Sequence, residues 1–132
     1  MGYIVANGLA ILVATFGGLL VGAAWRAASV RGPVRPRLTA PFAIVAVVAE
    51  AWLCAILAGA LILAPPAGPG PWVMALSSAV VIWIGFVLPT IVVTGLHAGL
   101  GPLRTGGYAL HWLVVMLVQA SILQAIGLAK PV

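Results

Sequence analysis

Four long apolar stretches constrain this chain more than any other feature of its sequence. A helix needs about 20 residues to cross a hydrocarbon core of roughly 30 Å, and each stretch is longer than that. Backbone groups in lipid must be hydrogen-bonded within the protein, and none of the stretches alternates apolar with polar residues as barrel strands do. We therefore predict an all-α integral membrane four-helix bundle. Its helices are expected at residues 3–25, 41–64, 72–97 and 107–128.

The composition agrees with this class of protein. Hydrophobic residues make up 64% of the chain and charged residues 5%, whereas about 25% of the residues of a soluble domain are charged. A soluble globular enzyme, a nucleic-acid-binding domain and a disordered chain are therefore excluded. We expect a single transmembrane domain over residues 1–132 that contacts the lipid bilayer and binds no nucleic acid. Cys54, the one cysteine, permits no internal disulfide and is expected to be a small buried hydrophobe.

The loops predict how the helices are connected and oriented. Short connections favour antiparallel neighbours, hence an up-down-up-down bundle. The first and third loops carry five arginines, the second carries no charge, and the far end of the chain holds only Lys130. By the positive-inside rule, these two loops are cytoplasmic and both termini lie outside, in a bacterial plasma (inner) membrane. The arginines are Arg26, Arg31, Arg35, Arg37 and Arg104.

Cap and breaker residues indicate where the helices start and bend. Thr39 is a candidate N-cap of the second helix, with Pro41 in its first turn. Thr105 is a possible cap of the fourth helix. Pro89 removes a backbone donor inside the third helix and predicts a kink there.

Small residues repeat at intervals of four along the first helix. Ala14, Gly18 and Gly22 form this stripe, which lets another helix backbone approach closely. The partner helix could belong to the same bundle or to a second copy in a homo-oligomer. The sequence leaves both alternatives open.

Glu50 is the only acidic residue of the chain, and it lies inside the second apolar stretch. At 1.5 Å per helical residue it is roughly 13 Å deep from the cytoplasmic start of that helix. An intramembrane carboxylate costs several kcal/mol unless it is paired or protonated, so it is a functional candidate. The alternative is a neutral, hydrogen-bonded Glu50 that fixes helix packing. Depth arithmetic places further polar residues of the other helices in the same half of the membrane, and we predict that they join Glu50 in one cluster: Thr15, Thr90, Thr94, His97, His111 and Gln119.

The two histidines raise the question of a cofactor. His111 could ligate a haem or a chlorophyll-type pigment, because Gly107 leaves room above the helix for a ring. His97, His111 and Glu50 are suitable metal-ligand types, but their spacing matches no compact metal motif, so we predict no metal site. No nucleotide loop and no Ser-His-Asp set is present. No catalytic residue is predicted, and we expect a protein that is not an enzyme.

Parts of the chain resemble the bacterial membrane proteins grouped as domain of unknown function 1761. In that family a Gly-Phe-x-x-Pro helix, a short Pro-Leu-Arg-like loop and a final Gly-Tyr or Gly-His helix follow in this order, after a Gly-x-x-Trp segment. The resemblance implies a four-helix membrane protein and implies no activity. The similar segments are Trp83–Thr90, Gly101–Arg104, Gly107–Tyr108 and Gly22–Trp25.

Two positions depart from the family pattern. Residues 26–29 are Arg-Ala-Ala-Ser, where the family has Tyr-Ser-Pro-like residues. Thr94 and the glycine-rich turn after it stand where the family has Asn and an acidic residue.

Three functions are compatible with these observations. The first is a non-enzymatic accessory or scaffold subunit that packs laterally against other membrane helices, favoured by the small size, the short loops and the small-residue stripe. The second is an oligomeric small-solute or proton-linked carrier in which Glu50 titrates, with His111, Thr90 and Gln119 around it. The third is a pigment- or haem-binding subunit that uses His111.

Overall fold

The computed structural model describes residues 2–29, 39–65 and 70–130, and within them it is a bundle of helices without strands. Four helices of these residues are long and apolar enough to span a membrane, over 8–29, 40–63, 71–97 and 102–126. The predicted all-α four-helix membrane bundle is therefore confirmed. The elements are α1 (Gly2–Ala6), α2 (Gly8–Ser29), α3 (Ala40–Leu63), α4 (Pro71–Ile82), the π-helix η1 (Trp83–Val87), α5 (Leu88–His97) and α6 (Pro102–Ile126).

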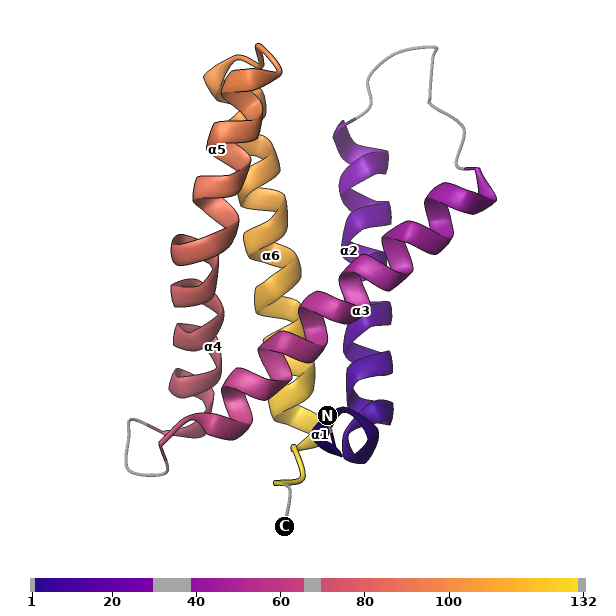
Figure 1. The fold of residues 1–132 in the computed structure, drawn as a ribbon, viewed down its shortest axis with the longest axis vertical. Helices are drawn as coiled ribbons and strands as arrows, with labels where there is room; N and C mark the ends of the chain where they lie inside the picture. The colour runs from indigo at the N-terminus through magenta and orange to yellow at the C-terminus, as the bar shows by residue number, and fades with distance from the viewer. Residues whose placement is uncertain (1, 30–38, 66–69, 131–132) are drawn as a thin grey trace.

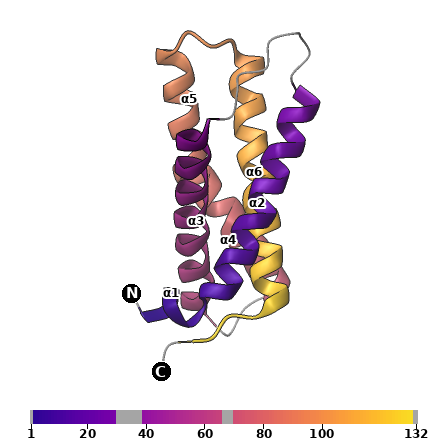
Figure 2. The same cartoon turned by 90° about the vertical axis from the view of Figure 1, so that its right-hand side faces the viewer.

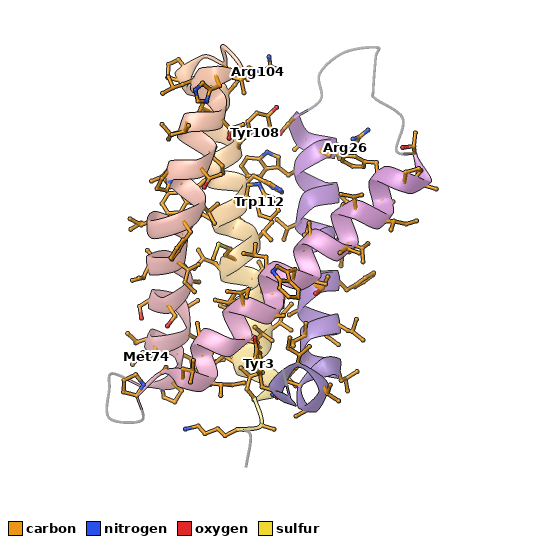
Figure 3. All side chains as sticks on the ribbon, in the orientation of Figure 1. Tyr3, Arg26, Met74, Arg104, Tyr108 and Trp112 are labelled. Atoms are coloured by element: carbon orange, nitrogen blue, oxygen red, sulfur yellow. The ribbon has the colours of Figure 1, made fainter. Side chains whose placement is uncertain are left out.

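The long helices run up and down between two ends of the bundle (Figure 1). Helices α2, α6 and the continuous α4–η1–α5 follow the long axis, whereas α3 crosses α2 diagonally (Figures 1 and 2). Both ends of the chain lie at one end of the bundle, which we call the terminal end. Arg26 and Arg104 lie at the opposite end, which we call the arginine end (Figure 3). The other predicted loop arginines, Arg31, Arg35 and Arg37, fall outside the described residues.

The structure tests the predicted N-caps of two helices, α3 and α6. Thr39 stands at the N-cap of α3 with φ −82° and ψ 151°, and a proline follows in the first turn, as expected. Helix α6 begins at Pro102 with Gly101 as its N-cap, earlier than the predicted start near Gly107. Thr105 is therefore not a cap. Its hydroxyl donates to the Gly101 carbonyl oxygen at 3.2 Å from within the first turns of the helix.

Pro89 is accommodated by a π-helical turn. The Leu88 N–H donates to the Trp83 carbonyl oxygen, so the helix is wider over η1 and continues beyond Pro89 as α5. The indole Nε1 of Trp83 donates to the Ala109 carbonyl oxygen at 2.9 Å and joins this turn to α6. The helix distortion predicted from Pro89 thus takes the form of a π-turn just before it, a form often found at functional sites.

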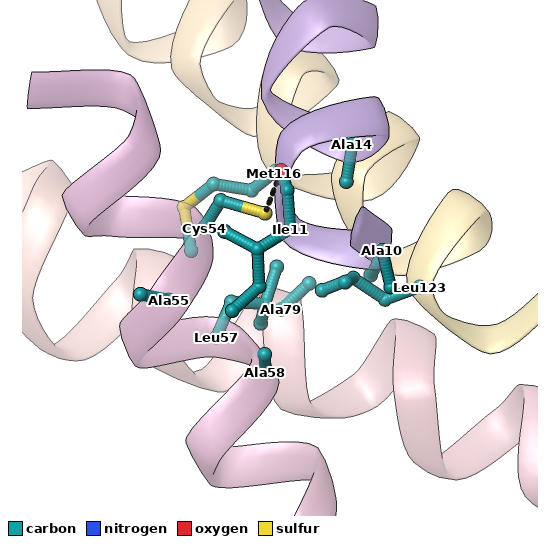
Figure 4. Packing of buried hydrophobic residues seen from close by; sticks show 11 residues of the cluster. Ala10, Ile11, Ala14, Cys54, Ala55, Leu57, Ala58, Ala79, Met116 and Leu123 are labelled. Carbon is teal, nitrogen blue, oxygen red and sulfur yellow. Dashed lines mark hydrogen bonds between the residues drawn. The ribbon is translucent and has the colours of Figure 1, made fainter. Parts of the chain in front are cut away.

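The apolar core lies in the terminal half of the bundle, at the start of α2 and in the second halves of α3 and α6. Figure 4 shows how its side chains pack. Helix α2 packs mainly against α6, and α3 joins them only from Glu50 onward. Residues 40–49 of α3 are exposed, except for the half-buried Ala46. The first half of α3 therefore leaves the bundle, as its diverging path in Figure 1 shows. The core residues include Ala10, Ile11, Ala14, Cys54, Leu57, Ala58, Ala79, Met116, Ala120 and Leu123.

Asn7 fastens the two chain ends together at the terminal end. The Ala129 N–H donates to its Oδ1 at 2.7 Å, and its Nδ2 donates to the Ala129 carbonyl oxygen at 2.9 Å. Nδ2 also donates to the Tyr3 carbonyl oxygen at 3.0 Å. The Tyr3 hydroxyl in turn donates to the Ala55 carbonyl oxygen at 3.3 Å, so α1 is held against α3.

Candidate functional site

Glu50 lies at the point where α3 enters the bundle, and its carboxyl fits against two glycines of α2. A Cβ atom at Gly18 would overlap Glu50 Oε2, and a Cβ atom at Gly22 would lie 3.8 Å from Oε1. Only 7% of the glutamate is exposed. The small-residue stripe therefore forms the recess that receives the carboxyl. Helix α6 brings two further polar side chains to this recess.

Gln119 and His111 face the same two glycines from α6. A Cβ atom at Gly18 would lie 2.7 Å from Gln119 Nε2, and one at Gly22 would lie 3.8 Å from His111 Cε1. Gln119 is completely buried and His111 is half-buried. We call Glu50, Gln119 and His111, with the glycines between them, the Glu50 cluster. Three of the predicted residues of the intramembrane cluster are thus brought together.

The polar atoms of this cluster are largely unsatisfied. Glu50 Oε2, His111 Nδ1 and both side-chain atoms of Gln119, Oε1 and Nε2, are buried without a hydrogen-bond partner among the described residues. Leaving such a group unpaired costs about 1–3 kcal/mol, and more when it is charged. Natural proteins pair nearly all buried polar groups, so a concentration of exceptions needs an explanation. A carboxyl, a carboxamide and an imidazole together can hold a small polar or charged ligand.

Aromatic rings border the cluster on the side of the arginine end. The His111 ring lies 5.4 Å from the Trp25 ring, at an interplanar angle of 50°. It lies 5.6 Å from the Trp112 ring, at 64°. Figure 3 shows Trp112 and Tyr108 in this half of the bundle. The sequence pattern alone did not indicate this role of Trp25, although Trp25 follows Gly22 by three residues and so shares its helix face.

Helix α5 contributes nothing to the cluster, which corrects the expectation for Thr90, Thr94 and His97. These three side chains are exposed. No described residue of α5 has its Cα within 8 Å of a Cα of α2 or α3. Helix α5 packs on α6 instead, where a Cβ atom at Gly95 would lie 2.6 Å from Thr105 Oγ1. At spacings of four and three residues the three polar side chains share one helix face, but this face is turned away from the bundle.

Thr15 and the core residue Cys54 both approach the backbone of Ile11, another core residue. The buried Thr15 hydroxyl donates to the Ile11 carbonyl oxygen at 2.7 Å, and Cys54 Sγ lies 3.7 Å from the same oxygen (Figure 4). Because its hydroxyl hydrogen is bonded within its own helix, Thr15 does not donate to the unpaired atoms of the Glu50 cluster. Ala14 and Gly18 are buried inside the bundle. The small-residue stripe thus serves packing within the chain.

Two further features bear on ligands. The space over Gly107 is open, which agrees with the room that a ring ligand on His111 would need. Binding of a haem or a pigment remains a prediction, which an absorption spectrum of the purified protein tests. A separate apolar groove of about 320 Å³ runs between α5 and α6 on the outside of the bundle. Its lining residues are Leu88, Val92, Leu96, Leu100, Pro102, Thr105, Gly106 and Ala109.

The chain matches no family model, no curated protein and no solved structure. The resemblance to domain of unknown function 1761 therefore stays a prediction. What the fold establishes is a small multi-pass membrane protein whose apolar helices contact the lipid bilayer. A more specific function must be argued from the Glu50 cluster and from the surfaces of the helices.

Proposed function

We propose that this protein is a small-solute carrier whose binding site is the Glu50 cluster. The observation that carries the proposal is the set of buried polar atoms without hydrogen-bond partners on Glu50, His111 and Gln119. A glutamate that only fixed helix packing would be expected to satisfy its oxygens on a neighbouring helix. Here the neighbouring positions are glycines, which provide space instead of hydrogen bonds.

The energetic cost of the cluster supports a role in binding. Each unpaired buried group destabilises the fold by about 1–3 kcal/mol. Folded chains tolerate such violations of local rules mainly at functional sites. Intramembrane acids in particular mark ion and substrate pathways. A ligand that satisfies these groups would recover part of the lost stability, so the cost itself favours occupancy.

The fold gives the cluster a route of access. Residues 40–49 of α3 stand away from the other helices, so the described chain does not close the bundle beside them. Four helices provide few walls for a transport path, and transporter sites commonly form between repeated units. We therefore propose that the carrier works as an assembly of two or more copies.

The exposed first half of α3 also favours a second candidate function. Phe42, Ile44 and Val48 are 57%, 63% and 63% exposed. Such an unpartnered apolar helix is suited to lateral packing against helices of another membrane protein. In this alternative the chain is a non-enzymatic accessory or scaffold subunit, and Glu50 acts only on stability or assembly.

Transport by the reconstituted protein separates the two functions. Proteoliposomes would be tested with a panel of cationic, neutral and anionic solutes, with and without a pH gradient that tests proton linkage. For a carrier, Glu50→Gln abolishes the solute-dependent current while the protein remains folded. Thr90→Val, a matched change at an exposed polar residue of α5, leaves the current unchanged. A current that is unchanged in Glu50→Gln would contradict the carrier function and favour the scaffold function.

A further inference from the structure

Charge at the Glu50 cluster selects among classes of ligand. Glu50 is the only acidic residue of the chain, and its Oε2 is buried and unpaired. The nearest side chains at the Gly18 and Gly22 recess are those of Gln119, His111 and Val115. An anion would be repelled by a carboxylate in this poorly solvated place, whereas a cation would compensate its charge. The carboxyl therefore favours a positively charged ligand.

Coordination chemistry argues against a metal ion as that ligand. Divalent calcium takes six to eight oxygen ligands, and zinc takes about four nitrogen, sulfur or oxygen ligands. Within the described ranges, no three His, Cys, Asp or Glu side chains are grouped as metal ligands. The cluster offers one carboxyl, one carboxamide and one imidazole. This set suits a single positive charge that needs one counter-charge.

Aromatic side chains supply the second half of a site for an organic cation. Trp25 and Trp112 flank the His111 ring at 5.4 and 5.6 Å between ring centroids. Both indoles are half-buried, so part of each ring surface is accessible. Tryptophan is the best partner in cation–π contacts, which act within about 6 Å of the ring centroid. The Glu50 carboxyl and the His111 ring therefore both approach Gly22, and the Trp25 indole lies against that ring.

Access from the lipid fits a cation with an apolar body. Glu50 is the first buried residue of α3, and the preceding residues 40–49 are almost all exposed. The cluster thus lies beside a stretch of helix that no other described helix covers. A hydrophobic cation dissolved in the bilayer could reach Glu50 along this side of the bundle without first crossing the apolar core.

We infer that the ligand of the Glu50 cluster is a monovalent organic cation with an apolar body, held between the Glu50 carboxyl and the Trp25 indole. This inference deepens the proposed carrier function and rests on it. It names the class of solute, which the cluster of unpaired atoms alone does not.

Two ions of the same shape and opposite charge test the inference on the unmodified chain. The protein would be placed in lipid nanodiscs, and binding of tetraphenylphosphonium and tetraphenylborate would be measured by equilibrium dialysis against protein-free nanodiscs. With the two ions measured in separate samples, we expect saturable binding of tetraphenylphosphonium and no saturable binding of tetraphenylborate. Equal saturable binding of both ions, or of neither, would overturn the inference.

Variants locate the bound cation. Glu50→Gln is expected to weaken tetraphenylphosphonium binding about 30-fold or more, because a desolvated counter-charge is lost. Trp25→Leu is expected to weaken it about fivefold to tenfold. Trp52→Leu, at a tryptophan of α3 that is 59% exposed, is the matched control and should bind like the unmodified chain. Unchanged binding in a folded Glu50→Gln would overturn the inference. If Glu50→Gln does not fold, the two-ion comparison and Trp25→Leu decide.

The transport panel distinguishes failure of this inference from failure of the proposed function. A Glu50-dependent current with a neutral or anionic solute, together with no binding of tetraphenylphosphonium, would show that the ligand is not an organic cation. The proposed carrier function would then still hold. If no solute gives a Glu50-dependent current and neither ion binds, both proposals are wrong.

Discussion

The carboxyl of Glu50 on α3 occupies the space that a side chain at Gly18 of α2 would fill. This relationship links the one acidic residue of the chain to the small-residue stripe of a different helix. Gln119 of α6 approaches the same glycine, with its Nε2 2.7 Å from the position of a Cβ. Helices α2, α3 and α6 thus meet at Gly18. The side chains of Glu50 and Gln119 fit there because Gly18 has no side chain.

Gly18→Ala is expected to destabilise the bundle. The added methyl would overlap Glu50 Oε2 and crowd Gln119 Nε2 and Val115, and overpacking of this kind costs about 1–3 kcal/mol. The measurement is thermal unfolding in mild detergent. Gly106→Ala is the control, because a Cβ at Gly106 of α6 meets nothing within 4 Å. Its stability should be unchanged or slightly higher. If Gly18→Ala were as stable as the control, the recess would not be as tight as described.

Gln119→Leu is expected to stabilise the protein and to weaken ligand binding. Both amide atoms of Gln119 are buried and unpaired, so an apolar side chain of similar size removes a penalty of about 1–3 kcal/mol. Unfolding temperature and tetraphenylphosphonium binding would be measured on the same preparation. Gln124→Leu, at a half-buried glutamine of the same helix, should change both quantities less. A loss of stability in Gln119→Leu would show that Gln119 is satisfied in the folded protein.

Asn7→Ala is expected to release the C-terminal segment. Asn7 is 5% exposed and exchanges two hydrogen bonds with the Ala129 backbone. At about 1 kcal/mol of net stabilisation for each bond, their loss costs about 2 kcal/mol. Hydrogen exchange of the Ala129 amide should become faster. Ser77→Ala removes only an exposed bond to the Met74 carbonyl within one helix and serves as the control. An unchanged hydrogen-exchange rate of the Ala129 amide in Asn7→Ala would contradict the claim that Asn7 holds the C-terminal segment in place.

Orientation in the membrane can be tested with fusions at the C-terminus. The positive-inside rule predicts that the arginine end is cytoplasmic and the terminal end is outside. Both chain ends lie at the terminal end (Figure 1). Alkaline phosphatase fused to the C-terminus should therefore be active in a bacterial host, and green fluorescent protein fused there should be dark. The opposite pair of results would reverse the orientation.

The class of fold could be predicted because it follows from a requirement of the bilayer. Residues in long apolar runs must form helices in lipid, and each run was long enough to cross it. The ends were less accurate, since they depend on local choices. Helix α2 continues through Arg26 to Ser29, and α6 starts at Pro102. The helix predicted from residue 3 is interrupted at Asn7, between α1 and α2. The Asn7 side chain contacts Ala129 near the other end of the chain, a contact that no local pattern reveals.

The candidate site was predicted in part, for a physical reason. Glu50, His111 and Gln119 could be placed by depth, since depth follows from position along a helix. Depth does not show which way a helix face is turned. Thr90 satisfies its hydroxyl on the Phe86 carbonyl oxygen at 2.6 Å within its own helix, so it does not have to face the interior. The role of Pro89 was visible in the sequence, but the π-turn also involves the Trp83 bond to α6.

The central claim is that Glu50 binds a cation inside the membrane, and infrared difference spectroscopy tests it most directly. Glu50 is the only acidic side chain, so ¹³C-labelled glutamate reports one carboxyl group. We predict that tetraphenylphosphonium shifts the labelled carboxyl band, that tetraphenylborate does not, and that Trp25→Leu reduces the shift at a fixed concentration. A labelled band that stays unchanged while tetraphenylphosphonium is bound would contradict the claim.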